Sequence, residues 1–209
     1  MYFGKDRQMN WKWTAKAMLS PLMKLRYRLK GGKHIYIAKG VKILKPRQIE
    51  AGDNINIRGY STIMCVTPNA RIVFEAGVDI GMFSRITAAT KIHLGKDVLT
   101  GPNVFISNHN HKYTDIDSPV IYQGIEVPHS IGTGGVYIGE GTWIGINCVI
   151  VGASYIGKHC VIGANSVVTC DIPDYCVAVG SPCKVIKRFN FENNKWEYVE
   201  TMKDDKTGK

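Results

Sequence analysis

Hydrophobic residues recur every six positions over much of this chain. The clearest series consists of Ile138, Ile144, Ile150, Ile156, Ile162 and Val168. Glycine directly follows four of these six residues, and small residues stand four positions after five of them. A period of six fits neither an α-helix nor a two-faced strand. It is typical of short strands that turn a corner every six residues and direct one aliphatic side chain inward.

The same spacing appears earlier in the chain in two further series. They are Ile37, Ile43, Ile49 and Ile55, followed by Phe74, Ile80, Ile86 and Ile92. Leu94 then restarts the phase toward Ile106. Three such strands close one coil in about eighteen residues, and stacked coils form a β-solenoid. The pattern therefore predicts an all-β solenoid over residues 35–189.

The repeat stops between Ile106 and Val136. The insert, residues 107–135, carries three of the six histidines, which are His109, His111 and His129. A long loop on a repetitive scaffold often carries function. We therefore expect a protruding loop over about residues 107–135 that contains the candidate active-site residues.

Two further motifs follow the insert: Val161-Ile-Gly-Ala-Asn-Ser-Val-Val168 and Val179-Gly-Ser-Pro-Cys-Lys-Val-Ile186. With the Ile-Gly repeats, they resemble the hexapeptide-repeat acyltransferases over roughly residues 35–190. The most similar branch holds the maltose, galactoside, xenobiotic and surface-polysaccharide O-acetyltransferases. The resemblance implies a left-handed parallel β-helix and a homotrimer with active sites between neighbouring subunits. It also implies acetyl-CoA as co-substrate, no metal and no covalent intermediate.

The resemblance implies that a histidine at the start of the loop acts as general base, which a neutral imidazole can do near pH 7. Counted from Ile106, the family's catalytic position falls five residues on, at His111. Asn110-His111 also matches the Asn-His form of the xenobiotic branch, and His109 is the alternative. Asp115 or Asp117 would hold the imidazole tautomer, and the sequence does not rank these two carboxylates. The plainer alternative is that both histidines are ordinary polar loop residues.

The resemblance also implies a set of coenzyme A-binding residues, which are Trp143, Gly145, Ala164, Lys184, Lys187 and Arg188. The small residues would let the pantetheine arm lie against the backbone, and the basic residues would bind phosphates. The structural alternatives are a hydrophobic cap for Trp143, a tight corner for Gly145 and Ala164, and a solvated charge cluster for the basic residues. One position departs from the family, because Cys170 stands where related sequences often have a lysine.

Charge is unevenly distributed along the 209 residues, whose net charge is +10. Residues 1–33 hold nine Lys or Arg and one acidic residue. Residues 34–209 hold eighteen Lys or Arg and sixteen acidic residues, so this part of the chain is nearly neutral. A nucleic-acid-binding domain would need a basic face on the folded body, so we expect no nucleic-acid partner. No apolar run is long enough to span a membrane, and no secretory signal is visible. We therefore expect a cytoplasmic protein whose six cysteines are reduced and, lacking CxxC pairs, bind no zinc.

The two ends differ from the repeat. Residues 8–30 carry an amphipathic stripe at helical spacing with Lys and Arg on the polar side, which predicts a helical extension over residues 1–34. This extension would cap the open solenoid, contact an anionic membrane surface, or do both. Residues 190–209 are polar and predict a half-disordered tail with aromatic docking points.

The leading functional hypothesis is an acetyl-CoA-dependent O-acetyltransferase that acts on a saccharide hydroxyl, in a surface-polysaccharide precursor or a sugar. An N-acetyltransferase of an amino sugar and a xenobiotic acetyltransferase are alternatives. A metal enzyme similar to the β-helical carbonic anhydrases is a different class, since His93 and His111 stand one coil length apart. A non-catalytic scaffold is a further one, and it would not bind coenzyme A.

Overall fold

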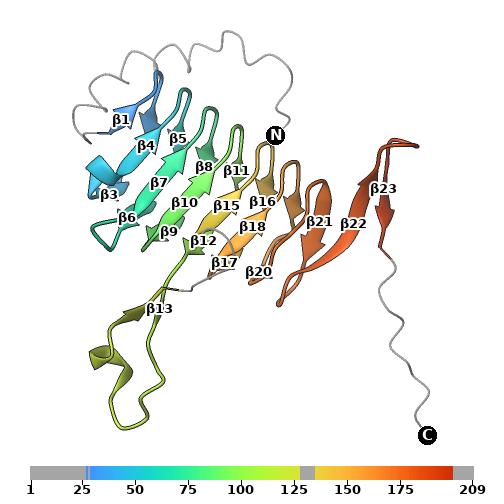
Figure 1. Ribbon diagram of the computed structural model, residues 1–209. Helices are drawn as coiled ribbons and strands as arrows, with labels where there is room; N and C mark the ends of the chain where they lie inside the picture. The colour runs from blue at the N-terminus through green and yellow to red at the C-terminus, as the bar shows by residue number, and fades with distance from the viewer. Residues whose placement is uncertain (1–26, 28, 128–134, 200–209) are drawn as a thin grey trace, which may run out of the picture.

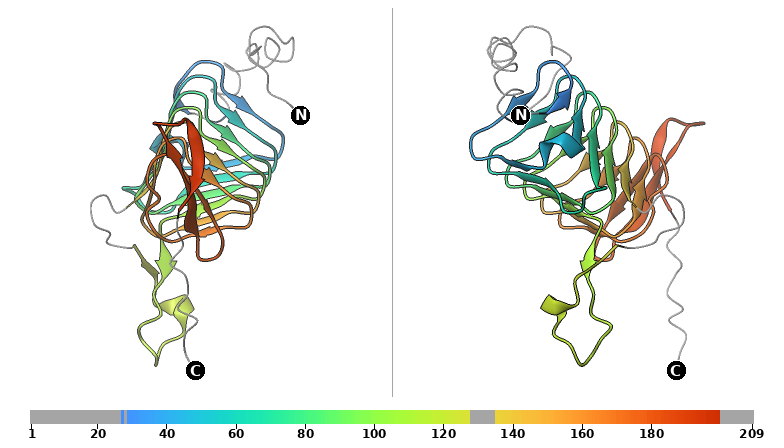
Figure 2. Two further views of the ribbon diagram at one scale, coloured as in Figure 1. Left: turned by 90° about the vertical axis from the view of Figure 1, so that its right-hand side faces the viewer. Right: turned by 60° about the vertical axis from the view of Figure 1, so that its left-hand side comes forward.

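The chain winds into a parallel β-solenoid of about seven turns, as the ribbon in Figure 1 shows. The structure is a computed structural model that describes residues 27, 29–127 and 135–199. Three flat sheets enclose a continuous apolar core, and a hairpin-like arm projects from one corner (Figure 2). The predicted all-β, left-handed parallel β-helix with a protruding loop is confirmed.

Each coil contributes one strand to each of three sheets, here called A, B and C. Sheet A consists of β1 (Lys30–Gly31), β4 (Ile49–Ala51), β7 (Arg71–Phe74), β10 (Lys91–Leu94), β15 (Val136–Ile138) and β18 (Ser154–Ile156). The parallel part of sheet B consists of β2 (Tyr36–Ile37), β5 (Asn56–Ile57), β8 (Asp79–Ile80), β11 (Leu99–Thr100), β16 (Trp143–Ile144), β19 (Val161–Ile162) and β21 (Cys176–Val179). Sheet C consists of β3 (Lys42–Leu44), β6 (Thr62–Cys65), β9 (Arg85–Ala88), β12 (Phe105–Ser107), β17 (Val149–Val151) and β20 (Val167–Val168).

The six-residue period places like residues above one another. Within sheet A, Ile72 pairs with Ile92, which in turn pairs with Val136, and all three are buried. The six aliphatic residues from Ile138 to Val168 are likewise fully buried. Burying such stacked aliphatic side chains is the main driving force for a solenoid in which each coil contacts only its neighbours.

The corners between sheets need tight turns and close contact between coils. Asn147 and Asn165 adopt positive φ angles at successive B–C corners, and the Asn147 side-chain amide donates to the Asn165 side-chain oxygen at 3.0 Å. Asparagine tolerates this left-handed conformation better than most residues. At Gly139, an added Cβ would lie 2.5 Å from the Gly157 carbonyl carbon, so only glycine fits between these two coils.

The arm leaves sheet C after Ser107 and returns to sheet A at Val136, close to the predicted limits. It contains β13 (Asn110–His111), which pairs antiparallel with β14 (Ile125–Glu126). A short 3-10 turn, η2 (Val120–Tyr122), lies between them, and another, η1 (Pro46–Gln48), lies at an early C–A corner. Residues 128–134, including His129, lie outside the described residues.

The C-terminal end differs from the sequence expectation. Beyond β21, sheet B continues antiparallel through β22 (Lys184–Asn190) and β23 (Lys195–Tyr198). Much of the expected half-disordered tail is therefore a hairpin, which Phe189 stabilises by edge contacts to Phe191 and Trp196. Sequence patterning missed it because its strands lie beyond the six-residue repeat.

The N-terminal prediction falls almost wholly outside the described residues. The solenoid begins with β1 at Lys30, five residues before the expected start of the β-helix at residue 35, so the last positions of the predicted helical extension belong to β1. Whether residues 8–30 cap the solenoid or contact a membrane stays a prediction. Among the described residues, the structure contains no helix long and apolar enough to span a membrane.

Candidate active site at the root of the arm

The root of the arm is fixed to the solenoid by one buried side chain, that of Asn108. Its Oδ1 accepts hydrogen bonds from the backbone N–H groups of Ala89 at 2.7 Å and Thr90 at 3.4 Å. Its Nδ2 donates to the Thr90 hydroxyl at 2.6 Å and to the Lys91 carbonyl at 3.0 Å. Asn108 therefore joins the arm to the C–A corner of the preceding coil and determines where the next residues lie.

His109, the alternative base, lies half-buried over the end of sheet C. Its Nδ1 is 3.0 Å from the hydroxyl of Ser107, which is itself buried. The pKa of His109 is lowered, mainly because burial disfavours the charged ring and further because His111 and Arg85 are close. The ring is therefore held in one orientation and kept neutral near pH 7.

His111, the predicted base, lies two residues further along the arm on β13 and is exposed. Neither predicted carboxylate contacts His109 or His111 within residues 29–127. Asp115 instead forms a turn, in which its Oδ1 accepts from the Asp117 backbone N–H at 3.0 Å. A local turn thus uses Asp115 within this chain, and the role of either carboxylate beside an imidazole stays a prediction.

The predicted coenzyme A residues of the wall lie at and beside the B–C corner. Trp143 is 51% exposed on the outer face of β16, between Leu99 and Val161 on the neighbouring strands. Gly145 and Ala164 follow at successive corners, where a Cβ added to Gly145 would lie 2.7 Å from the Ala164 backbone nitrogen. Close packing of two coils is therefore sufficient to explain Gly145. Ala164 is exposed beside it, and the contact of these two residues with coenzyme A stays a prediction.

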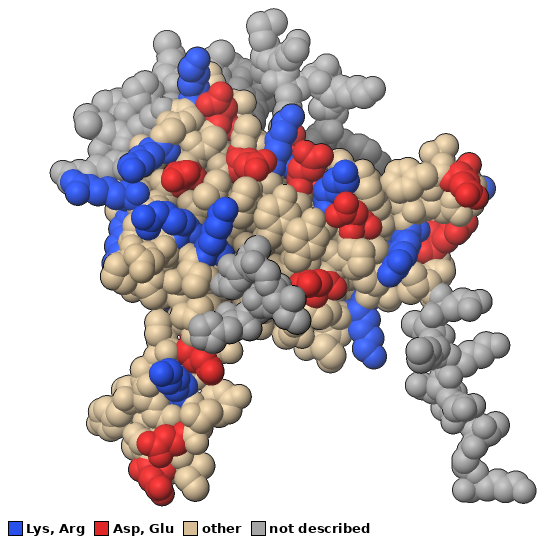
Figure 3. Space-filling view, in the orientation of Figure 1, with Lys and Arg blue, Asp and Glu red and all other residues tan. Residues whose placement is uncertain are grey.

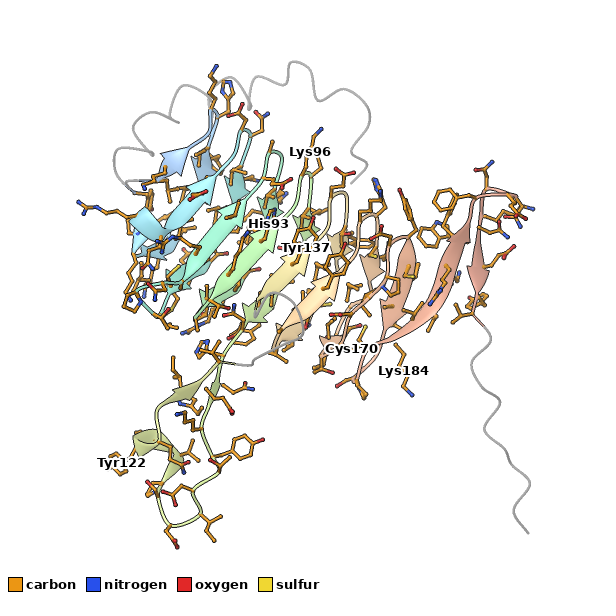
Figure 4. All side chains as sticks on the ribbon, in the orientation of Figure 1. His93, Lys96, Tyr122, Tyr137, Cys170 and Lys184 are labelled. Carbon is orange, nitrogen blue, oxygen red and sulfur yellow. The ribbon has the colours of Figure 1, made fainter. Side chains whose placement is uncertain are left out.

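The predicted phosphate-binding residues lie on β22. Lys184 and Arg188 are exposed, whereas the Lys187 Nζ lies 4.4 Å above the centre of the Tyr198 ring. Figure 4 shows Lys184 near Cys170, and the Cys170 thiol lies 3.8 Å from the Cys183 carbonyl. The position where related sequences often have a lysine therefore lies next to these basic residues. In this chain the exposed thiol of Cys170 occupies it.

One chain does not bring the two halves of the predicted site together. The arm histidines lie at the C–A corner, whereas Trp143, Gly145 and Ala164 lie at or beside the B–C corner. The width of sheet C separates the two corners, which corresponds to about 10 Å for strands of three residues. An extended cofactor can span such a distance, and so can a site that a neighbouring copy completes.

Sequence reasoning missed the residues that surround His109. Arg85 pairs in register with Phe105, and Thr87 pairs with Ser107, so both come from the preceding coil. A count of eighteen residues back from Ser107 would have ended at Ala89, whereas the register pairs Ser107 with Thr87 because this coil is longer than three six-residue repeats. Arg85 was not singled out because its chemistry is ordinary for a surface strand.

The metal alternative depended on His93 and His111 stacking on one face, and this does not occur. His93 pairs with Tyr137 on sheet A, and its Nε2 lies 2.8 Å from Glu75 Oε1. Figure 4 shows His93 and Tyr137 side by side on the wall, while His111 belongs to the arm. The insert breaks the coil count, so a separation of eighteen residues no longer means one coil. Among the described residues, no group of three His, Cys, Asp or Glu side chains is placed to bind a metal.

Comparison with known proteins identifies the family. Residues 135–170 match the family described as Bacterial transferase hexapeptide (six repeats). A galactoside O-acetyltransferase of Lactococcus lactis is 31% identical over 152 residues, which are 72% of this chain and 68% of that protein. This chain belongs to the hexapeptide-repeat acyltransferase family.

Two further similarities concern the sequence of one relative and the fold of one solved structure. WbbJ of Escherichia coli K12, provisionally named a lipopolysaccharide biosynthesis O-acetyl transferase, is 35% identical over 130 residues. The match covers 60% of this chain and 65% of WbbJ, so it spans less than two thirds of that relative. The N-acyltransferase AntD of Bacillus cereus, solved with dTDP and 3-hydroxybutyryl-CoA, superposes with a TM-score of 0.69. AntD is 17% identical, with 83% of this chain and 90% of AntD covered, and thus shows the shared fold.

Proposed function

We propose that this protein transfers an acetyl group from acetyl-CoA to a saccharide hydroxyl, in a sugar or a surface-polysaccharide precursor. The observation that carries the proposal is the pair of histidines at the root of the arm, at the single long break in an acyltransferase β-helix. The names of the Lactococcus and E. coli relatives support O-acetylation of saccharides. The proposed site of action is the cytoplasm, with peripheral membrane contact through residues 8–30.

The proposed reaction proceeds in one ternary complex. An unprotonated ring nitrogen of His111 takes the proton of the acceptor hydroxyl as the oxygen attacks the thioester carbonyl carbon. The carbon–sulfur bond then breaks, and the imidazolium returns its proton to the leaving thiolate. The products are the acetyl ester and free coenzyme A, with no covalent enzyme intermediate. Backbone N–H groups near the subunit boundary would stabilise the oxyanion.

His109 is the second candidate for the base, and a specific observation favours it. The Ser107 hydroxyl lies 3.4 Å from the His109 carbonyl oxygen, to which it can donate. The His109 Nδ1–H would then donate to that hydroxyl, leaving Nε2 unprotonated, as a base requires. We nevertheless retain His111, because the family spacing selects it. In this proposal the neutral His109 adds no like charge beside His111.

We further propose that the active enzyme is a homotrimer. The arm exposes Ile116, Ile121 and Tyr122, and Ile116 is 94% exposed. The wall separately exposes Trp143 and Ile146 beside the B–C corner. Two different apolar surfaces on one chain suit a closed ring, in which one surface meets the other on a neighbour. Such a ring would place an arm histidine beside the predicted cofactor corner of the next subunit.

The test is acetyl transfer by the purified full chain, followed as release of free coenzyme A thiol. A panel should include neutral sugars, amino sugars and polysaccharide fragments. We expect His111→Ala to lower turnover by about 10²–10⁴-fold while acetyl-CoA binding is retained. His159→Ala, at an exposed corner of the solenoid, is the matched control and should keep full turnover.

The other outcomes each identify an alternative. A large loss in His109→Ala with little change in His111→Ala would transfer the base role to His109. Transfer only to amino groups would identify an N-acetyltransferase. Acetyl-CoA that fails to bind would overturn the transferase proposal and leave the scaffold, and zinc in the purified protein would revive the metal alternative.

A further inference from the structure

A hollow of about 430 Å³ lies on the outer face of sheet A, next to the root of the arm. Glu50, Asn69, Arg71, Val73, Ala89, Thr90 and Lys91 line it. Its size is within the range of small-molecule sites. Figure 3 shows this face, on which Lys and Arg gather over the early coils and mix with acids along the upper edge.

Two positively charged residues lie side by side in the lining of this hollow. Arg71 and Lys91 are the first residues of β7 and β10 and pair directly in register. Both side chains are exposed, and neither takes part in an ion pair between described residues. Like charges directly opposite one another disfavour a sheet, so the pair is unfavourable without an anion.

The arginine is held in place rather than free to swing. Its Nη1 donates to the carbonyl oxygens of Ala70 at 2.8 Å and Pro68 at 3.4 Å. Gln48 Nε2 fixes the same turn by donating to the carbonyls of Pro68 at 2.7 Å and Ala70 at 2.8 Å. The rest of the guanidinium therefore starts from a defined position, which lowers the entropy lost when it binds an anion.

One wall of the hollow, on the side of β10, is connected to the candidate active site. Ala89, Thr90 and Lys91 form that wall, and the same three residues accept or donate the hydrogen bonds of Asn108. His109 follows Asn108 directly in the chain, and His111 lies two residues beyond. A ligand in the hollow would therefore lie close to the proposed site of acetyl transfer.

We propose that this hollow is an acceptor subsite that binds an anionic group, a phosphate or a carboxylate, on the saccharide to be acetylated. Arg71 and Lys91 would bind the anion, since paired donors suit these oxygens. Glu50 lies on the far side and would accept hydrogen bonds from neutral sugar hydroxyls while repelling the anion. The charges thus orient the saccharide. This inference rests on the proposed function for its meaning, but its binding test does not need acetyl transfer.

The experiment measures saccharide binding to the full chain by ligand-observed NMR, with glucose 1-phosphate, glucuronate and neutral glucose as probes. We expect at least one charged probe to bind at least about tenfold more tightly than glucose, because one hydrogen bond to a charged group strengthens binding by about that factor. Arg71→Gln and Lys91→Gln should each weaken that binding at least about fivefold by the same argument. Lys96→Gln, an exposed lysine on the coil of β10 but outside the hollow (Figure 4), is the matched control.

The two charged probes distinguish a phosphorylated acceptor from a uronic acid. Saturating coenzyme A should leave the binding unchanged, because its proposed phosphate contacts lie on β22. Equal binding of glucose, equal weakening by Lys96→Gln, or loss of binding with coenzyme A would each overturn the proposal. Acetyl-CoA titration of the same samples separates the two claims. If acetyl-CoA does not bind, the transferase proposal is contradicted. If Arg71→Gln and Lys91→Gln both leave anion binding unaltered, only the proposed acceptor subsite is contradicted.

Discussion

The solenoid wall and the arm use the same residue types in opposite ways. Ile144 and Ile150 in the wall are 0% exposed, whereas Ile116 on the arm is 94% exposed. The wall is held by stacked aliphatic side chains that the chain itself buries. The arm is held by polar contacts, in which Gln123 donates to the carbonyls of Asp115 and Ser118 at 2.8 and 2.6 Å.

This difference separates stability from function. The wall gains its free energy of folding within one chain, so its residues are accounted for by packing. The arm has hydrogen bonds of its own but exposed apolar side chains, which are typical of a surface that binds something else. The four predictions below test that separation, from the largest expected effect to the smallest.

The same substitution should have opposite outcomes in the two regions. Ile150→Ala removes a fully buried side chain and should lower the free energy of unfolding by about 2–5 kcal/mol. Ile116→Ala should change it by less than about 0.5 kcal/mol, because the side chain has almost no contacts to lose. Urea unfolding monitored by circular dichroism measures both. A large loss for Ile116→Ala in the free chain would show that the arm packs against the body.

The joint between the two regions should affect both stability and activity. Asn108→Ala leaves buried partners at Ala89 and Lys91 without their hydrogen bonds and should cost about 2 kcal/mol. It should also abolish most of the acetyl transfer, because it releases the histidines. Asn193→Ala removes an exposed amide from the turn between β22 and β23 and is the matched control, with transfer retained. Full activity in Asn108→Ala would show that the arm needs no anchor.

The internal clamp of the arm should act locally. Gln123→Ala removes three hydrogen bonds, two donated to carbonyls and one accepted from the Asp115 N–H at 3.1 Å. Hydrogen exchange should accelerate over residues 110–126, while global unfolding changes by less than about 0.5 kcal/mol. If exchange is unaltered there, the hydrogen bonds of Gln123 do not maintain the arm.

The smallest effect is a dependence of stability on pH. Burial lowers the pKa of His109 in the folded chain below its unfolded value near 6.5. The unfolded state therefore binds more protons between these two values, so stability is present above about pH 6.5 and falls as pH decreases through the folded pKa. His109→Gln should reduce this loss in thermal melts between about pH 7 and 5. An unchanged pH profile would contradict the lowered pKa.

The fold could be predicted because one period determines it. The aliphatic positions of the six-residue series, such as Ile92 and Ile162, are buried in the coil that the count assigns to them, and Ile43 is the half-buried exception. The hairpin of β22 and β23 could not be predicted this way, since its stability comes from aromatic contacts such as that of Phe189 with Trp196.

The candidate site could be predicted only in part. The break in the repeat located the arm, and its chain position identified His109 and His111. The places of Arg85 and Thr87 depend on the stacking of coils, and the hollow depends on Arg71 and Lys91 meeting across two strands. Asp115 accepts a hydrogen bond from the Asp117 backbone N–H in a local turn, a contact that its position in the loop did not predict.

The central claim is that the solenoid carries an acetyl-CoA site to which the arm contributes the catalytic histidine. Calorimetric titration of acetyl-CoA into the full chain tests this claim most directly. We predict saturable binding of one molecule per chain, within the affinity range usual for enzyme substrates. Binding should be retained in His111→Ala and weakened in Trp143→Ala. No binding at about 1 mM acetyl-CoA, the upper end of usual substrate constants, would contradict the account.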